Sequence, residues 1–215
     1  MIRLLLVTML IPNSGYSAPQ PAEPPIDFVA LDVNRGILPE SFQSQMTIQS
    51  HGSGNKIITS KIEVVSAGIN MVGTQIEPKR HKGRKLFIEG YKMWRVMRPA
   101  ADPKIVPMSR RRAGWPMIAY LLSLSLEQLH RDGFLKPIAG APPGFQRYAF
   151  TAGKSPFREV DLPHDPGTDP LSLVFHREKP GESTTINVKK FQEVTVGKAK
   201  RRVPQLVTLV IRSPG

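Results

Sequence analysis

The histidines and acidic residues are the first candidates for metal or acid–base chemistry, and their positions form no recognisable motif. The five histidines are His51, His81, His130, His164 and His176. None of them falls in the His-x-x-x-His or His-Glu-x-x-His spacing of zinc sites. Among the 17 Asp and Glu residues, no pair stands out by position as an acid–base dyad. We therefore expect neither a metal site nor acid–base catalysis.

Motifs for nucleotide binding and acyl transfer are missing as well. A phosphate-binding loop has a Gly five positions before its Gly-Lys-Ser, and Tyr148 occupies that position ahead of Gly153, Lys154 and Ser155. The sequence contains no G-x-S-x-G nucleophile motif. It therefore predicts a protein that is not an enzyme and that needs no cofactor.

The positive charge of the chain favours an anionic counterpart. Lys and Arg number 30 against 17 Asp and Glu, for a formal net charge of +13. Three clusters carry much of it: Lys79, Arg80, Lys82, Arg84 and Lys85; Arg110, Arg111 and Arg112; and Lys198, Lys200, Arg201 and Arg202. They either contact anionic headgroups or a partner protein, or are simply solvated in loops. Nucleic acid is a poor candidate partner, because only 7% of the residues are aromatic and those lie mostly in predicted strands.

Residues 82–101 form the segment around which the rest of the chain is organised. The sequence predicts two apolar strands, residues 86–88 and 91–97, joined by a tight turn at Glu89 and Gly90. Alternation puts Trp94 on one face of the second strand and Arg95 on the other, between two Met residues. A desolvated guanidinium needs a partner, so Arg95 either reaches across a cavity or extends to solvent on an outer face.

The remaining elements predict a mainly β protein with one or two helices. Alternating strands are expected at residues 43–50, 57–65 and 69–76, and further strands at 146–150, 157–162, 171–176, 184–196 and 205–212. Residues 26–38 could form a short helix or a strand, and residues 117–131 predict an apolar helix that ends before Gly133. Residues 136–144 read as a Pro- and Gly-rich loop. Short links between strands predict an antiparallel meander.

The N-terminal residues predict secretion. One basic residue, an apolar run at residues 4–11 and a small-residue region match a signal peptide, with cleavage after Ala18 or, alternatively, Ser17. An uncleaved anchor is the alternative interpretation, although the apolar run is much shorter than the ~20 residues of a membrane span. The chain has no Cys, so neither a disulfide nor a lipid-modified Cys is available. We expect a periplasmic protein with a signal peptide at residues 1–18, a Pro-rich linker and N-terminal segment at 19–41, and one domain at 42–215.

Residues 42–196 contain a basic segment followed by LFIEGYKMWRVMRP, then PKIVPMS, the helix LLSLSLEQL and the late hairpin LSLVFHREKPGESTTINVKKFQEV. In this order of segments they resemble the outer-membrane lipoprotein-sorting (LolA-like) family of lipid and lipoprotein carriers. The resemblance implies a curved antiparallel sheet that forms an incomplete barrel, covered by helix, with acyl chains held in the apolar concavity. The best-studied carriers of this family use an early-strand Arg to hold the helical lid, and this chain has none at residues 42–77.

The resemblance further implies a set of cavity-lining residues and a class of cargo. The expected ligand-binding residues are Met46, Ile48, Ile58, Ile62, Val64, Leu86, Ile88, Trp94, Val96, Leu121, Leu122 and Leu129. The expected cargo is a lipid or an acylated protein, and the expected docking surface is an anionic membrane. A non-enzymatic adaptor in an envelope assembly, such as a secretion or conjugation apparatus, is the alternative, in which the basic loops would bind a partner protein.

Overall fold

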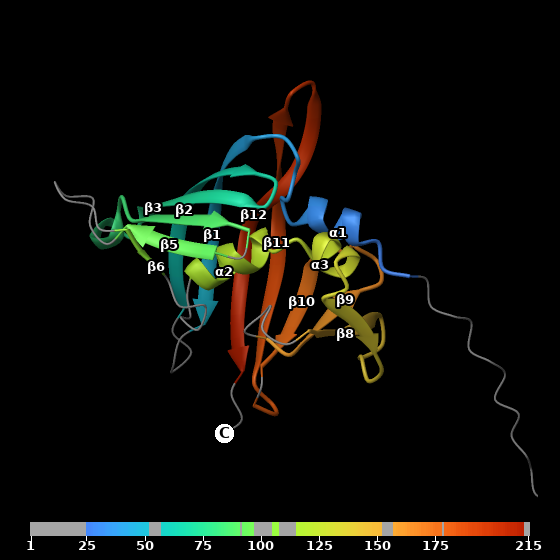
Figure 1. Cartoon of the computed structure of the whole chain (residues 1–215). Helices are drawn as coiled ribbons and strands as arrows, with labels where there is room; N and C mark the ends of the chain where they lie inside the picture. Colours follow the sequence, from blue (N-terminus) through green and yellow to red (C-terminus); the bar gives the residue numbers. More distant parts are fainter. Residues whose placement is uncertain are drawn as a thin grey trace, which may run out of the picture.

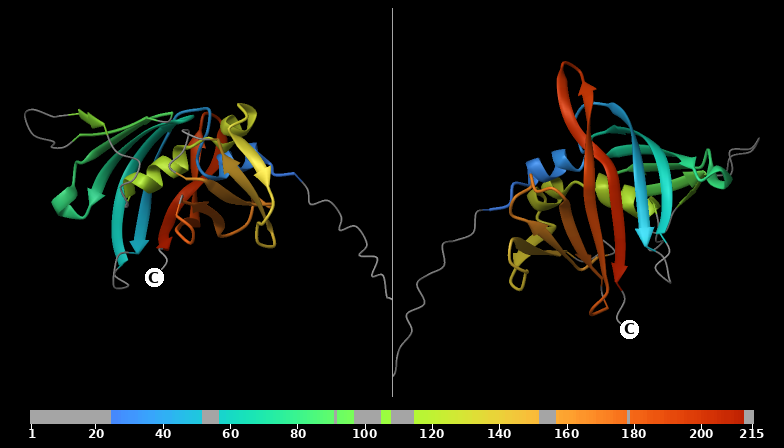
Figure 2. Two further views of the ribbon diagram at one scale, coloured as in Figure 1. Left: turned by 60° about the horizontal axis from the view of Figure 1, so that its bottom comes forward. Right: turned by 180° about the vertical axis from the view of Figure 1, so that it is seen from behind.

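One twelve-stranded sheet dominates the computed structural model, which describes residues 25–51, 57–90, 92–96, 105–107, 115–151, 157–177 and 179–212 (Figure 1). The order of the strands is β6-β5-β4-β3-β2-β1-β12-β11-β10-β9-β8-β7. The sheet is strongly curved and does not close into a barrel (Figure 2). The incomplete, helix-covered barrel predicted from the sequence is therefore confirmed.

Two antiparallel meanders make up this sheet. The first contains β1 (Phe42–His51), β2 (Ile57–Ala67), β3 (Asn70–Glu77), β4 (Lys85–Glu89), β5 (Lys92–Val96) and β6 (Ile105–Pro107). The second contains β7 (Leu135–Ile138), β8 (Phe145–Phe150), β9 (Glu159–Pro163), β10 (Leu171–His176), β11 (Ser183–Val196) and β12 (Ala199–Arg212). Parallel pairing of β1 with β12, as between Ile48 and Val207, joins the two meanders.

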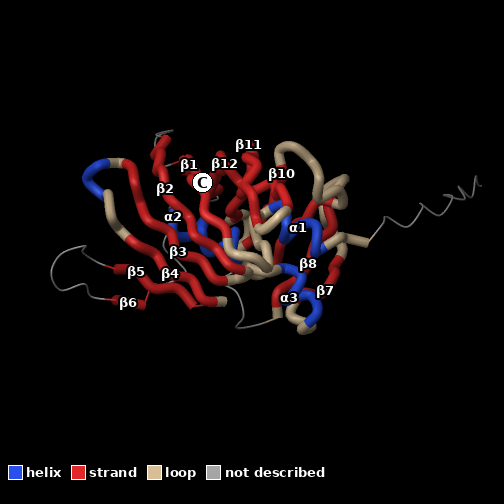
Figure 3. Tube along the Cα trace, turned by 90° about the horizontal axis from the view of Figure 1, so that it is seen from above, coloured by secondary structure: helices blue, strands red, loops and turns tan. Residues whose placement is uncertain are grey.

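The described residues include three short α-helices that lie against this sheet: α1 (Phe28–Asn34), α2 (Trp115–Ser123) and α3 (Leu126–Arg131). A 3-10 turn, η2 (Lys79–His81), joins β3 to β4. Helices α2 and α3 follow the edge strand β6 in sequence and precede the opposite edge strand β7, so the connection between the meanders crosses the hollow of the sheet. Seen from above, the strands curve around α2 (Figure 3). We call the face of the sheet that packs on α2 the concave face, and the opposite face the convex face.

Alternation along the strands separates these two faces. In β1, Met46 and Ile48 point into the concave face and are 4% and 1% exposed, while Thr47 between them is half-buried and Gln45 before them is exposed. The buried concave residues form one hydrophobic cluster with α2 and α3. Phe28 and Leu31 of α1 belong to the same cluster, so the folded unit begins before residue 42, the domain start expected from the sequence.

Several boundaries differ from those expected. The helix expected at residues 117–131 is two helices, because Ser125 caps α3 by accepting a hydrogen bond from the Gln128 N–H at 3.0 Å. The expected loop at residues 136–144 begins inside β7, an edge strand that tolerates Pro137. Gly133 has φ +74° and follows α3, as the sequence predicts.

The β11–β12 hairpin extends well beyond the sheet as a projecting arm (Figure 2). Antiparallel pairing continues to Val196 and Ala199, although β10 pairs with β11 only as far as Val188. The sequence suggested a loop for Lys200, Arg201 and Arg202, whereas the structure places all three in β12. A second apolar cluster, Leu38, Phe42, Val196 and Val203, packs one side of this arm against the start of β1.

Candidate functional site

Most residues expected to line a cavity share the concave face. The strand residues among them are 4% exposed or less: Met46, Ile48, Ile62, Val64, Leu86 and Ile88. Cross-strand pairs put them side by side, as in Met46 opposite Ile62. The helix residues expected with them, Leu121, Leu122 and Leu129, are also at most 1% exposed and belong to the same cluster. These nine residues therefore form one continuous apolar surface between sheet and helix.

Three expected residues stand apart from this surface. Trp94 pairs with Phe87 and Val96 with Lys85, whereas Leu86 and Ile88 pair with Arg95 and Met93. Strand alternation therefore places Trp94 and Val96 on the convex face, so their expected place beside Leu86 and Ile88 is wrong. Ile58 shares the face of Ile62 but lies near the open end of β2, where it is 47% exposed.

Helix α2 occupies the concavity. Its residues Met117, Ile118, Ala119, Tyr120, Leu121 and Leu122 are each at most 1% exposed. Exposure is low around the whole circumference of the helix, since these residues are consecutive. The helix packs on β1, β3 and β4. An acyl chain in the concavity would therefore have to take the place of α2 side chains.

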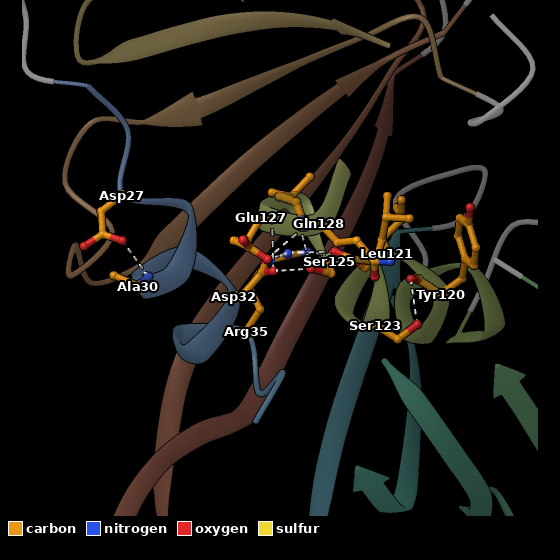
Figure 4. A network of polar contacts seen from close by, with 12 residues as sticks. Asp27, Ala30, Asp32, Arg35, Tyr120, Leu121, Ser123, Ser125, Glu127 and Gln128 are labelled. Atoms are coloured by element: carbon orange, nitrogen blue, oxygen red, sulfur yellow. Dashed lines mark hydrogen bonds and ion pairs between the residues drawn. The ribbon is translucent and has the colours of Figure 1, made fainter. Parts of the chain in front are cut away.

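A buried charged group holds the end of α2 in this position (Figure 4). Arg35, just past α1, donates from Nη1 to the Leu121 carbonyl at 2.9 Å and from Nη2 to the Leu124 carbonyl at 2.7 Å. Nη2 also forms an ion pair with the Asp32 carboxylate. The side chains of Arg35 and Asp32 are only 1% and 7% exposed. A cation beside carbonyls at the C-terminal end of a helix is favourable.

Asp32 makes the complementary contacts with α3. Its carboxylate accepts hydrogen bonds from the Ser125 hydroxyl at 2.7 Å, the Leu126 N–H at 3.1 Å and the Glu127 N–H at 3.2 Å. The Asp32–Arg35 pair therefore binds the C-terminal end of α2 with its cation and the first turn of α3 with its anion. We call these two side chains and their contacts the helix junction.

An aromatic cluster fixes α1 beside this junction. The Phe28 ring stacks on His130 of α3 with centroids 4.3 Å apart, and meets Tyr148 of β8 edge to face at 5.2 Å. Burial raises the pKa of Tyr148 above its usual value. Packing of His130 against Phe28 is an interaction that the position of His130 near a helix end did not suggest. The junction thus rests on a helix that is anchored to both α3 and the sheet.

Comparison with known proteins adds the fold family. No family model and no curated protein matches the sequence. Among solved structures, a LolA superfamily protein from Nitrosomonas europaea matches with a TM-score of 0.55 and 15% identity, over 84% of this chain and 83% of that one. A DUF1329 family protein from Desulfovibrio piger matches with a TM-score of 0.51 and 9% identity, over 81% of each chain. The chain has a LolA-like fold.

In this LolA-like fold, the Arg that contacts the helix in the concavity lies before the first strand and not within the first strands. Arg35 precedes β1, outside residues 42–77 where a lid-holding Arg was sought, and its guanidinium contacts α2 directly. Sequence reasoning missed it because a single Arg within residues 26–38, a segment that could form a helix or a strand, carries no local signal. The Asp-x-x-Arg spacing on a helix is the only hint, and it indicates an ion pair without identifying the partner helices.

The first basic cluster lies at one end of the LolA-like fold, in the connection between β3 and β4. Lys79, Arg80, Lys82, Arg84 and Lys85 are all exposed. The described residues give none of them an ion pair. They are therefore free to contact an anionic surface, which stays a prediction. Arg110, Arg111 and Arg112 lie outside the described residues.

Trp94 instead contributes to an open pocket on the convex face. Its volume is about 370 Å³, and its lining includes Val65, Val72, Phe87 and Trp94 from four neighbouring strands. These residues are direct cross-strand partners, Val65 with Val72, Val72 with Phe87 and Phe87 with Trp94. The sheet separates this pocket from the concavity.

A second charged network lies on the convex face of β8, β9 and β10. Arg147 donates from Nε to one Asp161 oxygen at 2.6 Å and from Nη2 to the other at 2.9 Å, and His176 Nε2 lies 2.8 Å from Asp161. Burial alone would raise the pKa of Asp161, but the hydrogen bonds from Arg147 and His176, with their charges, outweigh it and leave that pKa below its usual value. The hydrogen bond to Asp161 raises the pKa of Arg147. This network joins three strands.

In the described part of the chain, the His, Asp and Glu residues form no group of three that could hold a metal ion. None of the helices in that part is long and apolar enough to span a membrane.

Proposed function

We propose that this protein is a non-catalytic carrier that holds acyl chains of a lipid or an acylated protein in the concavity of its sheet. The observation that carries the proposal is a helix buried in an apolar concavity and held at its C-terminal end by a polar junction. Arg35 and Asp32 bind backbone atoms around the break between α2 and α3. Such contacts can be exchanged for water when the helix moves, which supports α2 as a displaceable cover.

Binding would replace one apolar contact with another. Displacement of α2 would expose the concave surface that includes Ile62 and Leu86, and an acyl chain would cover it again. Each buried methylene contributes about 0.8 kcal/mol, so a long acyl chain offsets the exposure of several α2 side chains. The LolA-like fold supports this class of ligand by likeness to the carrier family that the sequence resembles.

The proposed place of action is the periplasm. Residues 1–18 have the pattern of a signal peptide and lie outside the described residues. The exposed basic cluster from Lys79 to Lys85 would then bring the carrier to anionic headgroups, at about 1 kcal/mol per well-placed basic residue.

Native mass spectrometry of the processed protein from the envelope fraction, followed by organic extraction, tests the proposal. We expect an adduct that extracts as phospholipid or acylated peptide. Ile62→Gln, which places an amide on the sheet surface that the acyl chain would cover, should reduce the adduct, whereas Gln45→Leu on the convex face should leave it unchanged. A clean apo mass for the wild-type protein, with no uptake of added phospholipid, would refute the carrier function.

The projecting β11–β12 arm favours an adaptor as the second candidate. The hairpin carries exposed Lys189, Lys190, Lys200 and Arg201, and between Phe191 and Gln205 it makes no strand pairs with the rest of the sheet. If the protein is an adaptor, a pulldown from the envelope fraction should recover a stoichiometric partner that Lys200→Glu/Arg201→Glu loses and Lys79→Glu/Arg80→Glu retains.

A further inference from the structure

Arg95 points into the concave face from an outer strand of the sheet. The register of β4 with β5 pairs Arg95 with Leu86 and Met93 with Ile88. Residues that pair directly across strands share a face, so Arg95 lies with three side chains that are 1%, 3% and 5% exposed: Leu86, Ile88 and Met93.

Among the strand side chains that the structure describes, Arg95 is the only charged one on the concave face. Its other concave neighbours are apolar or uncharged, with Ser44, Ser60, Ser66 and Gln75 as the buried polar ones along β1 to β3. The charged residues of the surrounding strands alternate to the convex face, as Glu63 and Lys85 do. Arg95 is therefore an exception to the rule that the charged residues of these strands lie on the convex face.

Burial makes this position costly without an anion. The Arg95 Nε is fully buried, and no described residue accepts a hydrogen bond from it. A guanidinium withdrawn from water is destabilising unless it is paired, and its planar donors match carboxylate and phosphate oxygens in pairs. The side chain as a whole is half-buried, so it remains reachable from outside.

The position of Arg95 relative to α2 indicates how a ligand would lie. Helix α2 packs on β1, β3 and β4, and Arg95 comes from β5, the next strand outward. An anion at Arg95 would therefore sit at the margin of the concavity. A chain attached to it would run inward over Met93 and Ile88 toward the surface that α2 covers.

We propose that Arg95 binds the anionic group, carboxylate or phosphate, of an amphiphile whose acyl chain lies against Leu86, Ile88 and Met93. This inference rests on the proposed carrier function and narrows its cargo to anionic amphiphiles. The anion could belong to a free fatty acid or to a phospholipid headgroup, which present the same chemistry to a guanidinium.

Binding of charged and neutral probes with the same chain length tests it. Palmitate, hexadecyl phosphate and hexadecanol would be titrated by displacement of a fluorescent fatty acid from wild-type protein, Arg95→Met and Arg95→Lys. Lys92→Met is the matched control, because it removes one positive charge from an exposed position on the convex face of the same strand. Urea midpoints of all variants would establish that they fold.

Charged probes should bind wild-type protein about 10- to 100-fold more tightly than hexadecanol, as expected for a charge-assisted hydrogen bond. Arg95→Met should weaken the charged probes to the level of hexadecanol, Arg95→Lys should keep part of the preference, and Lys92→Met should keep all of it. If only the affinity for palmitate depends on Arg95, the natural anion is a fatty acid carboxylate. If only the affinity for hexadecyl phosphate depends on it, the natural anion is a phosphate headgroup.

The failures of the two proposals are distinguishable. Equal binding of charged and neutral probes, or an unchanged charge preference in Arg95→Met, overturns the role of Arg95 and leaves the carrier intact. If the wild-type protein binds none of the three probes, the carrier function and the role of Arg95 are both overturned.

Discussion

Replacement of Arg35 by Met should be the most damaging single change at the helix junction. The substitution keeps much of the aliphatic volume but removes the donors to the Leu121 and Leu124 carbonyls and the partner of Asp32. With both side chains at most 7% exposed, the Asp32 carboxylate is left as a buried charge. Breaking a buried pair by removing one partner costs about 3–5 kcal/mol.

Urea unfolding followed by circular dichroism measures this cost directly. In a chain of this size, each 1 kcal/mol lowers Tm by roughly 2–4 °C, so a thermal melt should shift by roughly 6–20 °C. The matched control is Arg131→Met, because Arg131 also pairs with a carboxylate, Glu127 at 3.2 Å, but its side chain is 66% exposed. That variant should lose less than about 0.5 kcal/mol.

The same variant also tests whether the junction controls access to the concavity. A weakened junction lowers the free energy needed to displace α2, so a larger fraction of Arg35→Met molecules has α2 displaced and can bind palmitate. The variant should therefore bind palmitate more tightly than the wild-type protein, in proportion to that fraction. A loss of unfolding free energy below about 1 kcal/mol would refute the argument that the junction fixes α2. An unchanged palmitate affinity in a destabilised variant would show that α2 is not the cover.

Three further outcomes follow from the structure. The folded-state pKa of Asp161 lies below its unfolded value of ~3.9. Ionised Asp161 therefore stabilises the fold above that unfolded value, and this stabilisation is lost as pH falls through the folded-state pKa. Asp161→Asn should flatten the acid side of a plot of urea midpoint against pH, and an unchanged slope would contradict this. Emission from Trp94, measured in a Trp115→Phe background, should not shift when palmitate saturates the protein, since the sheet lies between Trp94 and the concavity; a blue shift would place the ligand on the convex face. Leu122→Ala should cost about 2–5 kcal/mol in urea unfolding, and a smaller loss would mean that α2 is loosely packed.

Strand alternation made the sheet predictable, and contacts between distant segments limited the rest. Met46 and Ile48 alternate with polar residues, so β1 could be placed from its own sequence. The break between α2 and α3 could not, because Leu124 is a strong helix former and the group that stabilises the break is Asp32, in a different helix. The family resemblance put Trp94 beside Leu86 and Ile88, whereas the pairing of Met93 with Ile88 sets the face of the strand and puts Trp94 on the opposite one.

The same limit applies to the candidate site. The apolar lining followed from the strands and from a family resemblance, but the Asp32–Arg35 pair connects α1 to residues about 90 positions later, as in the hydrogen bond from Arg35 to Leu124 with a separation of 89. No periodicity encodes such a contact. Arg95 was recognisable as unusual because Met93 and Met97 flank it on the same predicted face, and only the register of β4 and β5 determined that it faces the concavity.

The parallel pair of β1 and β12 has a consequence for how the chain folds. Each meander forms from neighbouring segments, but β1 stays unpaired on one side until residues 206–209 reach it from the other end of the chain. The two outer strands, β6 and β7, are short and contain Pro107 and Pro137, which discourages pairing with other molecules, whereas β1 is long and contains no proline. During synthesis, β1 is therefore the strand most exposed to aggregation, and chains that stop before Leu206 should aggregate where the full chain does not.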